Sequence, residues 1–230
     1  MMHSEWEIKK LMVEIGQRVW TRGFVAANDG NFSVRLSENR ILTTPTGVSK
    51  GFMTTEMIVK VDARGKVLEG NRRYKPSSEL PMHLEVYRQR PDVQAVVHAH
   101  PPFATAFAVA GIPLDQCVLP EAVLTLGAVP IAPFALPSTE EVPLSIRDLI
   151  RQSDVILLEN HGALTVGPDL LSAYYKMETL EHTAKILFNA MQLGRINVLS
   201  EENRQRLIAL REKFNLRGKV LDCKGKTQGD

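Results

Sequence analysis

The sequence is short of cysteine, of long apolar runs and of net charge, and each shortage excludes a class of protein. Cys117 and Cys223 are the two cysteines among 230 residues. They lie far apart and outside any CxxC pattern, so we expect both to stay unpaired and no disulfide framework to form. No apolar run reaches about 18 residues, and the chain opens MMHSEWEIKK, so neither a membrane span nor a signal peptide is predicted. Together these shortages favour a cytoplasmic protein.

The charge balance and the missing glycine motifs exclude two kinds of nucleotide chemistry. The formal net charge is +2, far from the basic excess of a dedicated nucleic-acid binder. Neither GxxxxGK[ST] nor GxGxxG occurs, so nucleotide binding is not supported. With 44% hydrophobic and 23% charged residues, the chain has enough apolar material for one core. We expect a single domain over 1–215 and a flexible tail over 216–230.

Helical and strand patterns alternate along the chain. Serine and early proline favour a helix from Ser77 or Ser78 to Arg90, and the capping-box spacing STEE predicts another from Ser138. Strands in hairpins mixed with helices indicate a mixed sheet covered on both faces. The other expected helices are 5–22, 103–110, 168–192 and 202–214, and the expected strands are 31–36, 39–45, 57–70 (a hairpin), 93–100, 128–132, 155–159 and 162–166.

Histidines at two strand ends predict a metal site. His98 and His100 flank Ala99 at the end of VQAVVHAH, and alternation places both rings on one face, roughly 7 Å apart. His161 follows a second apolar strand and precedes Gly162. Glu79, in the first turn of the helix opened by KPSSE, is the expected fourth ligand. Such a set suits Zn²⁺, with Co²⁺, Mn²⁺ or Fe²⁺ as alternatives.

Two plainer interpretations of these residues stay open. An HxH pair is also typical of two satisfied polar side chains at a strand end. A closed structural zinc would instead have four permanent protein ligands and no open position.

Three short segments offer hydrogen-bond donors for an anion. They are Gly30-Asn31, Thr46-Gly47 and Ser77-Ser78. Serines at a helix start add hydroxyls to free backbone amides, which favours a phosphate or carboxylate. Each segment alone is also typical of an ordinary turn or cap, so the prediction rests on their joint occurrence beside Glu79.

Five motifs, GNFSVR, TTPTGVSK, KPSSE, VVHAHP and NHGAL, occur in this order and resemble the class II aldolase and adducin-head family over about 5–195. The resemblance implies a three-layer α/β/α sandwich around a nine-stranded, largely antiparallel sheet. It also implies a homotetramer with active sites between subunits and a phosphorylated sugar as substrate. By the motifs, His98, His100 and His161 ligate zinc and Glu79 is ligand and acid/base. The phosphate-binding residues are expected to be Asn31, Thr46, Gly47, Ser77 and Ser78.

The residue after the paired serines separates chemistries within the family. Aldolases resemble this chain in having glutamate there, whereas 4-epimerases have aspartate, so Glu79 favours zinc-dependent cleavage of L-fuculose 1-phosphate or a related deoxy-ketose 1-phosphate. The products would be dihydroxyacetone phosphate and an aldehyde. The fuculose phosphate aldolases also have a tyrosine in the segment that here reads IPLDQCVLPEAV. Glu121 in that segment is the candidate for the second acid/base.

Other functions on the same scaffold stay open. They are sugar-phosphate 4-epimerisation, decarboxylation of a sugar-acid phosphate and dehydration, because a fold does not fix its reaction. A non-catalytic, adducin-like interaction module is a further alternative, although such heads lack the metal-binding histidines.

Overall fold

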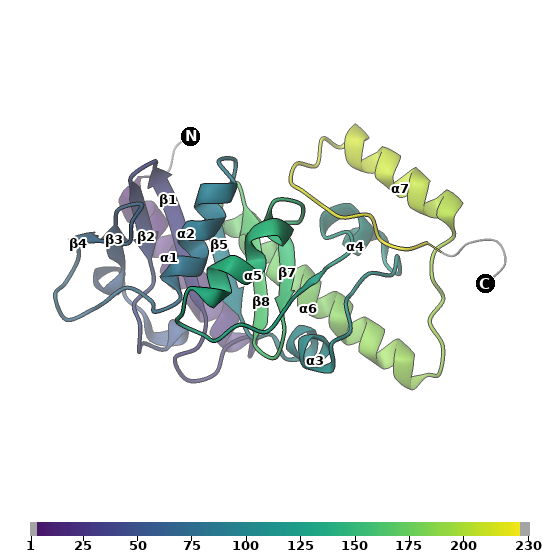
Figure 1. The fold of residues 1–230 in the computed structure, drawn as a ribbon, viewed down its shortest axis with the longest axis horizontal. Helices are drawn as coiled ribbons and strands as arrows, with labels where there is room; N and C mark the ends of the chain where they lie inside the picture. The colour runs from purple at the N-terminus through teal and green to yellow at the C-terminus, as the bar shows by residue number, and fades with distance from the viewer. Residues whose placement is uncertain (1–3, 226–230) are drawn as a thin grey trace.

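Eight strands form one mixed sheet in the computed structural model, which describes residues 4–225 (Figure 1). Their order is β4-β3-β2-β1-β5-β8-β7-β6, and every neighbouring pair is antiparallel except β6 and β7. Helices cover both faces, which confirms the predicted three-layer α/β/α sandwich with a mixed, largely antiparallel sheet. Within 4–225 the sheet has one strand fewer than the nine that the family resemblance implied.

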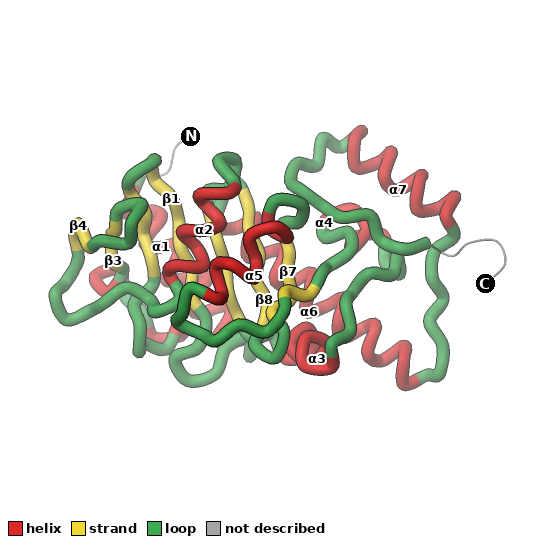
Figure 2. The backbone as a smooth tube through the Cα atoms, viewed as in Figure 1, coloured by secondary structure: helices red, strands yellow, loops and turns green. Residues whose placement is uncertain are grey.

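Figure 2 shows the strands at the left and middle of the view, with α2 and α5 in front of them and α4 and α7 at the right. The strands are β1 (Asn31–Ser37), β2 (Arg40–Thr43), β3 (Val59–Val61), β4 (Val67–Glu69), β5 (Ala95–Ala99), β6 (Ile131–Ala132), β7 (Val155–Leu158) and β8 (Gly162–Gly167). The helices are α1 (Glu5–Thr21), α2 (Leu80–Gln89), α3 (Pro102–Ala110), α4 (Pro120–Thr125), α5 (Glu141–Ile150), α6 (Leu170–Gln192) and α7 (Glu201–Lys213), with short 3₁₀ turns η1 (Lys50–Phe52) and η2 (Thr55–Met57). No helix in this part of the chain is long and apolar enough to cross a bilayer.

Alternation along β5 divides the core between the two faces of the sheet. Ala95, Val97 and Ala99 pack in one cluster with buried residues of α1, α3 and α6. Val96 packs in a second cluster with α2 and α5, which lie in front of the sheet in Figure 1. Because side chains alternate, His98 points to the same face as Val96 and therefore toward the α2 layer.

Two helices begin later than the sequence predicted. α2 begins at Leu80 with Glu79 as its N-cap, because Ser77 and Ser78 form a turn in which the Leu80 amide donates to the Ser77 carbonyl. α5 begins at Glu141, since Ser138 adopts a left-handed φ of 64° that is incompatible with a capping box there.

The prediction that both cysteines stay unpaired is wrong. Cys117 and Cys223 form a disulfide across 106 residues of sequence, with 5.3 Å between their Cα atoms. The reason is tertiary: the Cys117 amide donates to the Lys224 carbonyl, and the chain after α7 returns beside α4. The argument for a reducing compartment therefore loses this support.

The segment 216–230, expected to be a flexible tail, makes backbone hydrogen bonds to the body where the structure describes it. The Asp154 and Ala128 amides donate to the Lys219 and Leu221 carbonyls, so the described part, 216–225, packs against the body. Residues 226–230 lie outside the described residues.

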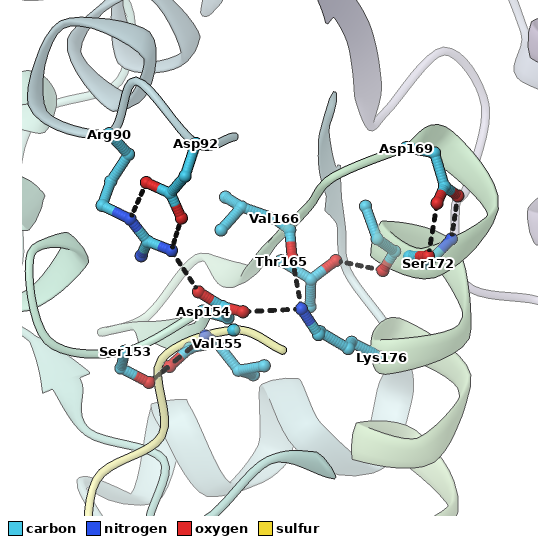
Figure 3. A network of polar contacts seen from close by, with 12 residues as sticks. Arg90, Asp92, Ser153, Asp154, Val155, Thr165, Val166, Asp169, Ser172 and Lys176 are labelled. Carbon is cyan, nitrogen blue, oxygen red and sulfur yellow. Dashed lines mark hydrogen bonds and ion pairs between the residues drawn. The ribbon is translucent and has the colours of Figure 1, made fainter. Parts of the chain in front are cut away.

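A buried ion network joins the end of α2, the residue before β7 and α6 (Figure 3). The Asp154 carboxylate accepts from Arg90 at 2.8 Å and from Lys176 at 2.7 Å. The side chains of Arg90 and Asp154 are only 2% and 3% exposed. Removing one member of such a buried network leaves its partners charged and unpaired in the interior.

We therefore expect Asp154→Asn to lower the free energy of unfolding by about 3–5 kcal/mol, because it removes the charge that compensates two cations. Asp148→Asn is the control, since Asp148 is 85% exposed and its ion pair with Arg151 spans 3.4 Å. The control should change stability by no more than about 1 kcal/mol. Urea denaturation followed by circular dichroism measures both, and equal losses in the two variants would contradict the role of Asp154.

Candidate metal and substrate site

Three imidazoles meet where β5 ends and β8 begins. His98 lies in β5, His100 follows that strand by one residue, and His161 immediately precedes β8. The antiparallel register of β5 with β8 pairs Ala99 with Ala163, which brings the two strand ends together. One ring nitrogen from each histidine lies within 4.8 Å of the others. The structure thus gathers the three histidines that the sequence singled out.

Glu79, the N-cap of α2, is the fourth member of the cluster. Its Oε2 lies 3.3 Å from His98 Nε2, and its Oε1 lies 3.2 Å from His161 Nε2. Asn31, at the start of β1, donates from Nδ2 to Glu79 Oε2 at 2.8 Å and thereby orients the carboxylate. Glu79 reaches the cluster because it caps α2 instead of extending the helix, so its side chain turns toward the strand ends.

The backbone sets the tautomer of His98. Its Nδ1 lies 2.9 Å from the Ala163 carbonyl oxygen, which can only accept, so Nδ1 carries the hydrogen. Nε2 then presents a lone pair toward Glu79 and His100, whose own Nε2 is 3.1 Å away. A histidine fixed in this way is typical of a metal ligand.

Burial and charge control the protonation of the cluster. Desolvation, followed by the charge on His98, lowers the pKa of His100 to about 3 and that of His161 to about 4. For His98 burial alone would lower the pKa, but the Glu79 carboxylate outweighs it and the pKa is raised. Burial likewise opposes ionisation of Glu79, yet His98 and His161 hold its pKa well below the usual range. The Glu79 carboxylate is therefore held ionised beside the three imidazoles.

These residues fit a divalent metal ion. Glu79 Oε1 is buried and accepts no hydrogen bond within the described residues, although it lies 3.2 Å from His161 Nε2. The lowered pKa values keep His100 and His161 neutral at pH 7, with nitrogens facing the centre. Imidazole nitrogens with one carboxylate oxygen are ligands that Zn²⁺ accepts. The donor set, rather than any one contact, identifies the candidate metal centre.

The three donor segments of the predicted anion site lie next to one another. The Thr46 amide donates to the Lys75 carbonyl and the Ser77 amide to the Thr44 carbonyl, which places the turns 44–47 and 75–78 side by side. Thr46, Gly47 and Ser78 are exposed and Ser77 is half-buried, whereas Asn31 is buried against Glu79. Gly47 has a left-handed φ of 69°, which suits a residue without a side chain.

Glu121 stays apart from this cluster. Only the end of the segment 112–123 is helical, since α4 begins at Pro120, and Glu121 is exposed in its first turn. Among residues 4–225 no hydrogen bond or ion pair joins Glu121 to Glu79 or to the three histidines. Its role as second acid/base therefore remains a prediction that the contacts within this chain do not support.

Sequence reasoning missed two charged neighbours of the site. Asp29 Oδ2 lies 3.5 Å from His100 Nδ1, and Lys50 is buried between the turns of the anion site. In the sequence, only the positions of Asp29 and Lys50 close to Asn31 and Gly47 could have indicated them. His83, four residues after Glu79, is buried and bonded through Nδ1 to Ser33 Oγ at 2.7 Å, and burial lowers its pKa to about 3.

Comparison with known proteins identifies the family. A family model, the class II aldolase and adducin N-terminal domain, matches residues 10–188. The chain is 34% identical over 197 residues to a 3-oxo-tetronate 4-phosphate decarboxylase of Haemophilus influenzae, covering 84% of this chain and 92% of the relative. It is 37% identical over 177 residues to an L-fuculose phosphate aldolase of Methanococcus vannielii, covering 77% and 93%.

A solved structure agrees with these sequence relatives. The L-fuculose-1-phosphate aldolase of Thermus thermophilus superposes with a TM-score of 0.72 at 33% identity, covering 84% of this chain and 98% of that one. The relatives carry out two different reactions, so the likeness establishes a lineage and not one substrate. The chain belongs to the class II aldolase and adducin N-terminal domain family.

Proposed function

We propose that the protein is a metal-dependent lyase that breaks a carbon–carbon bond in a phosphorylated α-hydroxyketone. The observation that carries this proposal is the Glu79 carboxylate, held by Asn31 within 3.3 Å of His98 and 3.2 Å of His161. A carboxylate placed between a metal centre and an anion site can move a proton at the reacting carbon.

The proposed ligands are His98, His100, His161 and Glu79, with Zn²⁺ as the first candidate and Co²⁺, Mn²⁺ or Fe²⁺ as alternatives. When bound, the ion supplies Lewis acidity at the substrate's ketone. Asn31, Thr46, Gly47, Ser77 and Ser78 are proposed to hold the phosphate.

The first candidate reaction is retro-aldol cleavage of L-fuculose 1-phosphate or a related deoxy-ketose 1-phosphate. The bond beyond the hydroxyl-bearing carbon breaks, its electron pair passes to that carbon and the ketone as an enediolate, and an aldehyde leaves. We assign to Glu79 the transfer of a proton to the enediolate carbon, which gives dihydroxyacetone phosphate. Because the resting carboxylate is ionised, Glu79 first takes that proton from water. The hydroxyl on the carbon that becomes the aldehyde must also lose its proton, and a second base has to accept it.

The second candidate is decarboxylation of 3-oxo-tetronate 4-phosphate, the reaction named for the Haemophilus influenzae relative. Loss of CO₂ from this acid leaves the same enediolate, and the same protonation by Glu79 gives dihydroxyacetone phosphate. No hydroxyl proton has to be removed, so this reaction needs no second base. The absence of tyrosine from 112–123 and the isolation of Glu121 therefore favour it.

A homotetramer with sites between subunits is proposed on the family resemblance. Apolar side chains that such an assembly could cover are exposed at the ends of α3 and α6, where the Phe103 and Phe188 rings lie 5.6 Å apart. Val109, near the end of α3, and Leu193, the C-cap of α6, are 59% and 85% exposed.

His161→Asn should remove most of the bound metal, because it deletes a ligand without disturbing β5. We expect the metal content after dialysis, measured by mass spectrometry, to fall by about tenfold or more from one ion per chain. His182→Asn, an exposed histidine on α6, is the control and should retain the wild-type content. Wild-type protein purified without stoichiometric metal would contradict the metal centre and would favour the non-catalytic interaction module.

Glu79→Gln should lower kcat by about 10²–10⁴-fold, because the amide cannot carry the transferred proton. The assay couples release of dihydroxyacetone phosphate to its reduction, with L-fuculose 1-phosphate, a methylthio pentulose 1-phosphate and 3-oxo-tetronate 4-phosphate as substrates. Glu38→Gln, an exposed glutamate between β1 and β2, is the matched control. If wild type turned over every substrate no faster than the Glu79 variant, the proposed lyase function would be wrong.

The second product separates the two candidate reactions. Retro-aldol cleavage releases one aldehyde per dihydroxyacetone phosphate, and decarboxylation releases one CO₂ and no aldehyde. NMR of the products with ¹³C-labelled substrates measures both. An epimer or an alkene as the main product would instead assign one of the other reactions of this scaffold.

A further inference from the structure

Lys50, the last residue of the TTPTGVSK motif, is a buried cation that the proposed reaction does not use. Its side chain is 1% exposed, and its Nζ donates to the Asn28 carbonyl at 2.9 Å and to the Val48 carbonyl at 2.7 Å. Among the ion pairs of residues 4–225, none joins Nζ to a carboxylate within 4.0 Å. Two backbone carbonyls are thus its bonded acceptors.

The backbone of Lys50 is held firmly in place. Lys50 begins the 3₁₀ turn η1, which packs against α1 at Gly16, where an added Cβ would lie 2.5 Å from the Lys50 carbonyl oxygen. From this fixed backbone the side chain reaches the turns that hold Asn28 and Val48. The position of Lys50 is therefore set by packing, independently of any ligand.

Keeping this ammonium buried costs stability. Desolvation lowers the pKa of Lys50 to about 8, although the negative charges of Asp29 and Glu79 oppose the shift. The protonated form still dominates at pH 7. A buried lysine without a carboxylate partner contributes little to folding stability, which points to a different role.

The two carbonyls belong to the segments that present the anion-site donors. Asn28 lies three residues before Asn31, and Val48 directly follows Gly47. The second of these segments is already bonded to the turn that carries Ser77. The first is bonded to the second as well, since the Thr44 amide donates to the Phe32 carbonyl next to Asn31. Lys50 adds a direct bridge between the Asn28 and Val48 turns themselves.

We propose that Lys50 is a positioning residue that clamps the Asn28 and Val48 turns together, so that the donors around Asn31 and Gly47 converge on the substrate phosphate. The inference rests on the proposed function for the identity of that anion. Because both hydrogen bonds end on carbonyls, Lys50 acts through the turns rather than by touching the substrate. The positive charge of Lys50 also attracts a phosphate dianion electrostatically.

The test replaces the ammonium by a neutral side chain of similar length. Lys50→Met should weaken binding of inorganic phosphate, measured by calorimetry, by about tenfold or more, and should raise KM for the active substrate by a similar factor. Because Lys50 does not touch the reacting atoms, kcat should change by no more than about threefold. Metal content should remain at the wild-type level.

Lys60→Met is the matched control, since Lys60 pairs with Glu5 and Glu69 away from the site and should leave phosphate affinity unchanged. If Lys50→Met does not fold, Lys50→Gln, which retains an N–H donor, replaces it and should lose affinity by about threefold or more. Phosphate affinity within about twofold of wild type in a folded Lys50 variant would overturn the proposal and leave Lys50 a purely structural residue.

The phosphate measurement needs no turnover, so it separates this inference from the proposed function. Wild type that binds phosphate but converts no substrate would refute the lyase assignment and leave the clamp to be judged on affinity. Wild type that binds no phosphate would refute the clamp as well.

Discussion

The antiparallel register of β1, β5 and β8 is the constraint on which the rest of the site depends. It sets Asn31 opposite His98 and His98 opposite Leu164, so the ligand-bearing ends of three strands coincide. The approach also requires Gly162, because an added Cβ there would lie 2.6 Å from both the Ala99 carbonyl oxygen and a carbon of the His100 ring. A side chain at this position would force β8 from β5 and would separate His161 from its partners.

Two buried polar networks in this fold have opposite character. Around Asp154, every carboxylate oxygen and guanidinium nitrogen of the Arg90–Asp154 pair has a partner, so the network is closed and serves stability. Around Glu79, buried Oε1 and Asn31 Oδ1 have no hydrogen-bond partner among residues 4–225, although Oε1 faces His161 Nε2 at 3.2 Å. Unpaired buried polar atoms are rare and destabilising unless something binds them. The contrast distinguishes a structural ion network from one prepared for a ligand.

Local periodicity predicts that His98 and His100 share a face, whereas their meeting with His161 and Glu79 depends on the register of β5 with β8 and on the position of α2. An HxH pair on a strand must share a face, and a glutamate at a helix start must lie near the first turn, whatever the remaining fold. Helix starts were less predictable, since the 75–78 turn bonds to the 44–47 turn and thereby delays α2 to Leu80. The Cys117–Cys223 disulfide and the packing of 216–225 depend on a chain return of about a hundred residues, which no local pattern encodes.

The sequence by itself determined which residue types meet at the site and which layers the fold has, because alternation and helical spacing are properties of neighbouring residues. Only the tertiary structure decided how those residues are oriented: the His98 tautomer, the Glu79 contacts and the burial of Lys50 each require groups from distant segments. The separation has one physical reason. Backbone geometry sets the direction of a side chain locally, whereas its charge, its hydrogen bonds and its exposure to water are set by whatever the folded chain places beside it.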